Sequence, residues 1–203
     1  MIKNIIFDFG DIFINLNKMA TYKAMAKLGV TEISEDMIEV YHQYEKGLIY
    51  TNEFIKFFKN TLAIPKKDLI RAWNAVLLDF PKHRLEFVKQ LAADKKYRLF
   101  LLSNTNDLHI SWVKKSCGRK FYKEFKNCFE QFYLSHEINF RKPDMAIYEF
   151  VLNENNLIPQ ETFFIDDLEE NTVVAKKLGI QVWNLNPEKE DVVNLLTRKE
   201  FLF

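Results

Sequence analysis

The first sixteen residues, MIKNIIFDFGDIFINL (residues 1–16), contain a short apolar run that ends in an aspartate. The run Ile2–Phe7 has the length of a β-strand and no polar alternation, which is typical of a parallel strand covered on both faces. Asp8 follows it directly. Because Asp8 and Asp11 interrupt the apolar stretch and no small-residue cleavage site follows, we do not expect a secretory signal here. The segment predicts the first strand of a buried sheet.

Four other segments resemble this strand, three of them strongly and one weakly. The strong ones are Tyr97–Leu102, Thr162–Ile165 and Ile180–Leu185, and the weak one is Gln131–Leu134. Helical patterns lie between them at Leu85–Ala93, Leu108–Lys115, Asp144–Asn155 and Glu169–Leu178. This alternation predicts the α/β class, with a doubly wound parallel sheet that has helices on both faces.

One long segment breaks the alternation. Between about Asn17 and Lys82 the sequence has helical patterns only, interrupted at Gly29, Gly47 and Pro65. We interpret residues 17–82 as an all-helical cap inserted after the first strand, which leaves residues 1–16 and 83–203 as the core. Because ligands bind at the carboxyl ends of the strands in such folds, a cap inserted there covers the site.

Composition excludes several classes of function. The 203 residues are 48% hydrophobic, which is enough for a sizeable core, and 29 basic residues nearly balance 28 acidic ones. We therefore expect no nucleic-acid and no membrane partner, and no segment has the ~18 apolar residues that a membrane span needs. Cys117 and Cys128 form no metal or disulfide pattern, which favours a reduced, cytoplasmic protein. The composition allows a monomer or a dimer.

Polar residues follow the predicted strands at the places where the strands end. Strand ends of a parallel sheet meet at one edge, so these side chains should share one crevice. Clustered carboxylates need a cation, and oxygen ligands without histidine or cysteine favour Mg²⁺. A hard cation, a lysine and a hydroxyl group together suit phosphoryl transfer. The residues concerned are Asp8, Ser103, Asn104, Lys142, Asp166 and Asp167.

Taken singly, each of these residues has an ordinary interpretation. An aspartate after a strand commonly caps a helix or turn, and Ser-Asn is common in turns. A lysine before proline is usually solvated. Their order along the chain and their shared position at strand ends are what argue for one site.

At these residues the sequence resembles the haloacid dehalogenase-like hydrolases. The four motifs of that family correspond to IIFDFGDIF, FLLSNTNDLH, FRKPDMAIY and FFIDDLEEN, in the family's order and over nearly the whole chain. Within the family the chain is similar to the sugar-phosphatase-like branch typified by bacterial α-glucose-1-phosphate phosphatase. The resemblance implies a Rossmann-like core with a small helical cap, and a Mg²⁺-dependent phosphatase that acts on a small phosphomonoester, a sugar phosphate above all.

The resemblance also implies a role for each motif residue. Asp8 would attack phosphorus and form an aspartyl-phosphate, Ser103 and the Asn104 backbone N–H would hold the transferring group, and Lys142 would neutralise charge. Asp8, the Gly10 carbonyl group and Asp167 would bind Mg²⁺, with Asp166 behind them or sharing the metal, and Asn171 would hold the metal-site loop. Lys46 of the cap would contact the substrate; the other cap candidates are Tyr41, His42, Tyr44, Glu45 and Tyr50.

The chain departs from the family pattern at Gly10, where most members carry an aspartate that protonates the leaving oxygen. Its loss removes a contribution of about 10²–10⁴-fold in rate and favours substrates with good leaving groups. Asp11 could partly replace it, alone or through a water, or could cap the following turn. Two other functions stay open: a non-enzymatic binding module, and a metal-independent 2-haloacid dehalogenase, for which the pair Asp166-Asp167 has no use.

Overall fold

The computed structural model describes residues 1–30 and 32–198 and contains one five-stranded, all-parallel sheet. Its strand order is β3-β2-β1-β4-β5, and β1 at the centre pairs with β2 on one side and with β4 on the other. The bounds are β1 Asn4–Phe7, β2 Arg98–Ser103, β3 Gln131–Leu134, β4 Thr162–Asp166 and β5 Gln181–Asn184. The predicted doubly wound parallel sheet is therefore confirmed, and each predicted strand is present.

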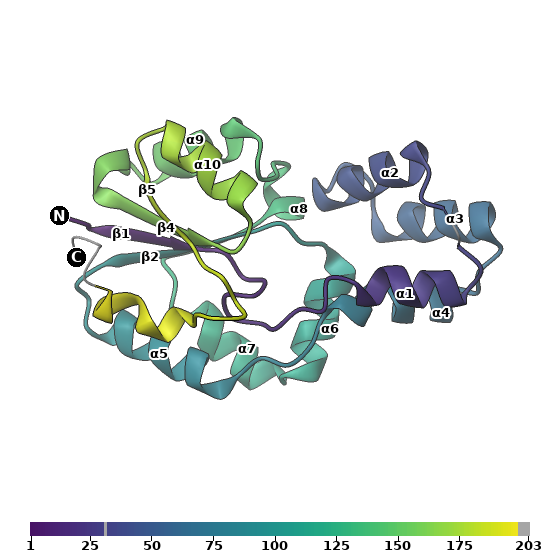
Figure 1. Ribbon diagram of the computed structural model, residues 1–203, viewed down its shortest axis with the longest axis horizontal. Helices are drawn as coiled ribbons and strands as arrows, with labels where there is room; N and C mark the ends of the chain where they lie inside the picture. Colours follow the sequence, from purple (N-terminus) through teal and green to yellow (C-terminus); the bar gives the residue numbers. More distant parts are fainter. Residues whose placement is uncertain (31, 199–203) are drawn as a thin grey trace.

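Helices cover both faces of the sheet, as Figure 1 shows. One face packs on α9 and α10, and the other on α5, α6 and α7 with the 3₁₀ segment η3. All four residues of β1 are buried, as expected for a strand covered on both sides. The bounds are α5 Lys82–Ala93, α6 Asp107–Ser116, α7 Arg119–Lys126, α8 Ser135–Ile138, α9 Met145–Glu154, η2 Pro159–Glu161, α10 Glu169–Lys177 and η3 Val192–Thr197.

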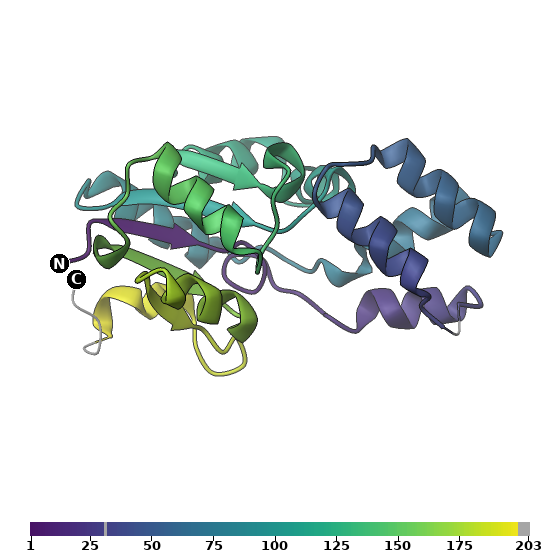
Figure 2. The same cartoon turned by 90° about the horizontal axis from the view of Figure 1, so that it is seen from above.

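The insertion between β1 and α5 is helical. Its elements are α1 Ala20–Lys27, α2 Glu35–Glu45, α3 Thr51–Leu62, α4 Lys66–Trp73 and η1 Asn74–Val76. They have an apolar core of their own that includes Phe54, Phe58 and Trp73, and they project from the carboxyl end of the sheet (Figures 1 and 2). The chain enters and leaves through two antiparallel connections, 15–17 and 76–79, joined by backbone hydrogen bonds. The exact boundaries at 16/17 and 82/83 stay predictions.

The end of α2 lies against the core. Gly47 approaches the core backbone so closely that a Cβ at this position would lie 2.0 Å from the carbonyl oxygen of His136. Next to it, Asn139 donates a hydrogen bond to the Lys46 carbonyl group over 2.8 Å, and the Lys46 ammonium group lies 2.8 Å from Asp144. These contacts bring α2 over the carboxyl ends of the strands. Among the described residues, no helix is both long and apolar enough to cross a membrane.

Candidate active site

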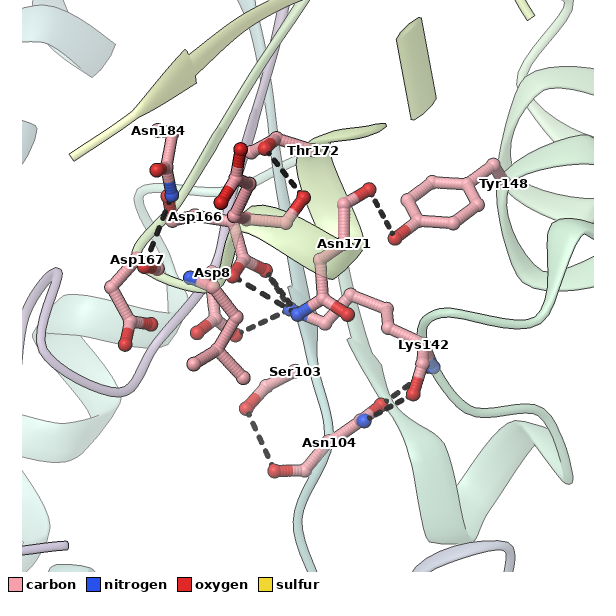
Figure 3. A network of polar contacts seen from close by, with 12 residues as sticks. Asp8, Ser103, Asn104, Lys142, Tyr148, Asp166, Asp167, Asn171, Thr172 and Asn184 are labelled. Atoms are coloured by element: carbon pink, nitrogen blue, oxygen red, sulfur yellow. Dashed lines mark hydrogen bonds and ion pairs between the residues drawn. The ribbon is translucent and has the colours of Figure 1, made fainter. Parts of the chain in front are cut away.

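The ends of β1, β2 and β4 bring the predicted site residues together. Asp8 follows β1, Ser103 is the last residue of β2, and Asp166 is the last residue of β4. The Lys142 ammonium group lies between the two carboxylates, 2.7 Å from Asp8 Oδ1 and 2.6 Å from Asp166 Oδ2 (Figure 3). Residues that are more than 130 positions apart in the sequence therefore meet in one buried cluster.

Lys142 is fixed to the end of β2 by the side chain of Asn104. The Asn104 Nδ2 group donates to the Lys142 carbonyl oxygen over 2.8 Å, and the Lys142 backbone N–H donates back to Asn104 Oδ1 over 2.9 Å. With 1% of its surface exposed, Lys142 is not the solvated surface lysine that its sequence context alone would suggest. The Asn104 side chain is thus occupied in positioning Lys142, which leaves its backbone N–H for the phosphate role that the sequence predicts.

Asp166 is held by three nitrogen donors. Besides Lys142, the Leu168 backbone N–H donates over 2.8 Å, and Asn171 Nδ2 lies 3.0 Å from both carboxylate oxygens. Tyr148 in turn donates a hydrogen bond to the Asn171 carbonyl group over 2.9 Å. Both Asp166 oxygens therefore accept hydrogen bonds from the protein, which favours a supporting position for Asp166 behind the metal.

Asp167 faces a lysine that the sequence analysis did not single out. Lys18, on the connection to the cap, forms a short ion pair with Asp167 and lies 3.3 Å from Asp11 Oδ2. Burial raises the pKa of Asp167, and the hydrogen bond from Lys18 acts against this rise. Lys18 therefore competes with any cation for Asp167. No sequence signal separates this lysine from its neighbours, because its position depends on the path of the connection.

Asp11 closes the loop that follows β1. Its Oδ1 accepts a hydrogen bond from the Leu16 backbone N–H over 2.9 Å, and its backbone has a positive φ of 53°. The Gly10 carbonyl group accepts from the Ile12 N–H over 2.6 Å, so the loop contains a three-residue turn centred on Asp11. These contacts match the alternative in which Asp11 caps the turn that follows the first strand.

Gly10 lies beside the Asp8 carboxylate, at the place where most family members carry an acid. A Cβ at position 10 would lie 3.9 Å from Asp8 Oδ2 and 2.8 Å from Leu16 Cδ1. Leu16 therefore fills the space that a side chain at position 10 would need. Position 10 therefore supplies no carboxylate group beside Asp8.

The donor set fits a divalent cation. Oxygen atoms of Asp8, Asp166 and Asp167 all lie within 4.8 Å of one another. Burial, together with the charges of Asp166 and Asp167, raises the pKa of Asp8 to about 7 despite the opposing effect of Lys142. With Asp11, four carboxylates face two ammonium groups, so a cation with two positive charges would balance the cluster. Oxygen ligands alone suit Mg²⁺.

A cavity of about 310 Å³ joins this cluster to the cap. Asp8, Gly10, Ser103, Asn104, Lys142, Asp167 and Asn171 line its core side, and Lys18, Tyr41, Glu45 and Arg141 line it as well. Of the six cap candidates, Tyr41 and Glu45 reach the cavity. Tyr44 stacks on Phe54 in the cap core with ring centroids 4.3 Å apart, and Tyr50 is exposed. Lys46 pairs with Asp144 and does not line the cavity; its contact with substrate stays a prediction.

His109 lies between the cap and the core. Its ring stacks on Trp73 with centroids 5.7 Å apart, and its Nε2 lies 3.4 Å from the Trp73 carbonyl oxygen. Its Nδ1 lies 3.3 Å from Nδ2 of Asn106, whose Oδ1 caps α6 by accepting from the His109 N–H. These partners assign the proton to Nε2. These contacts place His109 at the start of α6, where Asn106 is the N-cap.

We expect the stability of the protein to fall as the pH falls from about 6.5 to about 4, in part because of His109. Burial lowers the pKa of His109 from 6.5 to about 4, so in this window the unfolded chain binds a proton that the folded chain does not. Because His109 is only partly buried, we expect the free energy of unfolding to fall by about 2 kcal/mol, which is less than the full free energy that corresponds to the pKa shift. Urea unfolding of wild type and His109→Gln at pH 7.5 and 4.5 measures it. Equal losses in both proteins would contradict the prediction.

Comparisons with known proteins agree with this site. The family model described as haloacid dehalogenase-like hydrolase matches residues 5–185. D-ribitol-5-phosphate phosphatase of Bacteroides thetaiotaomicron is 29% identical over 194 residues, which cover 90% of this chain and 91% of that enzyme. A solved haloacid dehalogenase family enzyme of the same organism, in complex with magnesium, is 36% identical with a TM-score of 0.85, over 97% of this chain and 99% of that one. Another structure of that enzyme holds magnesium and inorganic phosphate, with 35% identity, a TM-score of 0.82 and coverage of 96% and 99%. The chain belongs to the haloacid dehalogenase-like hydrolases.

Proposed function

We propose that the chain is a Mg²⁺-dependent phosphatase that hydrolyses the phosphomonoester of a small sugar or polyol through an aspartyl-phosphate on Asp8. The observation that carries the proposal is the group of Asp8, Asp166 and Asp167, with Lys142 between Asp8 and Asp166. Asp8, Lys142 and Asp167 line a cavity that polar residues of the cap line as well. The similar enzymes with magnesium, with inorganic phosphate and with a pentitol phosphate as substrate support the same chemistry.

Each residue has a defined part in the proposed reaction. The Asp8 carboxylate attacks phosphorus, and its new O–P bond forms as the P–O bond to the leaving group breaks. Lys142 neutralises the charge that Asp8 shares with the phosphoryl oxygens, while the Ser103 hydroxyl and the Asn104 backbone N–H hold those oxygens. Asp8, the Gly10 carbonyl and Asp167 would hold Mg²⁺, which supplies charge neutralisation and orientation when bound. Water then attacks phosphorus, the O–P bond to Asp8 breaks, and inorganic phosphate leaves.

The leaving oxygen takes its proton from water in this proposal, because Gly10 offers no side-chain acid and Asp11 is engaged by the loop. General acid catalysis is typically worth about 10²–10⁴-fold. We therefore expect turnover on an alkyl phosphate to be slower than on an ester with a good leaving group such as p-nitrophenyl phosphate.

A panel of phosphate esters tests the function. Phosphorylated pentitols, pentoses and hexoses, together with p-nitrophenyl phosphate, are assayed for phosphate release with Mg²⁺ and with EDTA. We expect release from at least one sugar or polyol phosphate and a loss of at least about 10²-fold without the metal. A folded protein that releases no phosphate from any of these compounds would contradict the proposal and favour a binding module. Equal activity in EDTA would contradict the role of the metal.

We also infer a cytoplasmic location and a monomer or a dimer. Cys117 and Cys128 are free thiols, and burial raises the pKa of both, so both are kept in the unreactive, protonated form. Light scattering on the purified protein distinguishes a monomer from a dimer.

A further inference from the structure

A charged cluster lies on the cap side of the catalytic cavity and takes no part in the chemistry described so far. Glu45, the last residue of α2, accepts hydrogen bonds from Arg141 Nε over 3.2 Å, and Arg141 Nη2 lies 3.1 Å from the same carboxylate oxygen. The Tyr41 hydroxyl, one helical turn earlier on α2, donates to the other oxygen of Glu45 over 2.6 Å. All three residues line the cavity that contains Asp8 and Lys142.

The cluster is costly to bury. Glu45 is 5% exposed, and its burial raises the pKa of its carboxyl group. Buried ion pairs seldom add more stability than apolar residues of the same size would. Docking of the cap on the core also has other contacts, namely the Lys46–Asp144 ion pair and the close approach of Gly47 to His136. The cap therefore has docking contacts that do not need a buried charge pair in the wall of the cavity.

The cluster has hydrogen-bonding capacity to spare. Glu45 Oε1 accepts one hydrogen bond, from Tyr41, and each carboxylate oxygen has room for about two. The Arg141 guanidinium group has five N–H donors, of which those on Nε and Nη2 serve Glu45 Oε2, and it also interacts with the Tyr41 hydroxyl group. Acceptor and donor groups thus lie side by side on residues that line the cavity. Vicinal hydroxyl groups, each both donor and acceptor, have the matching pattern.

The cluster also has a fixed relation to the nucleophile. Arg141 directly precedes Lys142 in the chain, and the Lys142 ammonium group contacts Asp8. Asn104 holds the Lys142 backbone to the end of β2 on both sides. A group bound at Arg141 is therefore placed at a set distance from a phosphorus atom at Asp8.

We propose that Tyr41, Glu45 and Arg141 form the subsite for the leaving group and select a polyhydroxylated, uncharged one. The proposal rests on the phosphatase function proposed above and deepens it. The negative charge of Glu45 offsets the positive charge of Arg141, so a second phosphate group on the substrate gains little binding energy from this pair. An apolar chain would cover these polar groups without offering them hydrogen bonds in place of water, which a site built from hydrogen-bonding groups rejects strongly.

Two esters that differ only in their hydroxyl groups test the subsite. D-ribitol 5-phosphate and n-pentyl phosphate share the phosphate group and the five-carbon chain, and p-nitrophenyl phosphate reports the chemistry at Asp8. For the wild type we expect kcat/KM to be at least about 10²-fold higher for the pentitol ester than for the pentyl ester. A wild type that hydrolyses p-nitrophenyl phosphate without this preference overturns the subsite alone. A wild type that hydrolyses none of the three overturns both the subsite and the proposed function.

Variants then assign the selectivity to the cluster. Glu45→Gln and Arg141→Gln should each lower kcat/KM for D-ribitol 5-phosphate by about 10–100-fold, the value of a hydrogen bond to a charged group. The values for n-pentyl and p-nitrophenyl phosphate should fall less than the value for D-ribitol 5-phosphate, so that the preference for the pentitol ester shrinks. Tyr41→Phe, which removes one hydroxyl group, should act in the same direction. Asp144→Asn, which breaks the neighbouring cap–core ion pair outside the cavity, is the matched control and should leave the substrate ratio unchanged.

Two outcomes would overturn the assignment. A parallel loss on all three esters, with thermal unfolding unchanged, would mean that the cluster acts through the position of Lys142 rather than on the leaving group. Unchanged kcat/KM for D-ribitol 5-phosphate in folded Glu45→Gln and Arg141→Gln would mean that the pair does not contact the substrate.

Discussion

Asp8→Asn should abolish phosphatase turnover, with a fall in kcat of at least about 10⁴-fold, because the reaction requires a carboxylate oxygen to form the bond to phosphorus. The substitution keeps the shape of the side chain and removes its charge. Phosphate release from p-nitrophenyl phosphate with saturating Mg²⁺ measures the effect, since this ester needs no acid for its leaving group. Turnover within tenfold of the wild type would exclude Asp8 as the nucleophile.

The same variant should be more stable than the wild type when the metal is absent. The pKa of Asp8 is raised from 3.8 to about 7. Above pH 7 the folded protein therefore contains an ionised Asp8 carboxylate, which burial and the charges of Asp166 and Asp167 disfavour. The unfolded chain loses this proton near pH 4, so the free energy of unfolding falls as the pH rises through this window. Asn removes this cost. Thermal unfolding in EDTA at pH 8 should show a higher midpoint, by about 2–4 °C for each kcal/mol, and a lower midpoint would contradict this explanation.

Lys142→Met should lower both activity and stability. Lys142 is 1% exposed and its ammonium group contacts both Asp8 and Asp166, so its loss leaves two carboxylates buried without their counter-charge. We expect the free energy of unfolding to fall by about 3–5 kcal/mol and kcat to fall by about 10²–10³-fold. Urea unfolding and the p-nitrophenyl phosphate assay measure the two effects.

Lys142→Arg is the matched control because it keeps the charge and changes the shape. The planar guanidinium group does not take the place of a compact ammonium group between two carboxylates, so we expect stability closer to that of the wild type with activity still reduced. Mg²⁺ should restore part of the stability of Lys142→Met, because a bound cation neutralises the same carboxylates. Wild-type turnover in folded Lys142→Met would contradict the role of Lys142 in charge neutralisation.

The strands and the catalytic cluster were predictable from the sequence because their signals are local. Apolar runs without alternation identified four strands of the sheet, and a weaker signal identified the fifth at Gln131–Leu134. In a parallel sheet the carboxyl ends of the strands meet at one edge. Asp8, Ser103 and Asp166 each stand at or directly after a strand end. Helix α7 at Arg119–Lys126 was not predicted. Five of its eight residues are charged, and two, Tyr122 and Phe125, are buried.

The residues that line the cavity from the cap were less predictable, because their position depends on how the cap packs on the core. The sequence favoured Lys46 for substrate contact, whereas its direct neighbour Glu45 lines the cavity and Lys46 pairs with Asp144. A shift of one residue on a helix turns the side chain by about 100°, so adjacent residues face different surroundings. Helical periodicity alone does not tell which of them faces the site.

The sequence by itself determined the fold class, the family and the residues around the nucleophile, since each rests on an apolar run and the polar residue next to it. The tertiary structure decided which charged groups share the cavity. Lys18 reaches Asp167 across 149 positions, and Arg141 reaches Glu45 across 96. No periodic pattern or fixed spacing in the sequence marks such pairs, because they form only when two separately packed cores dock in one orientation.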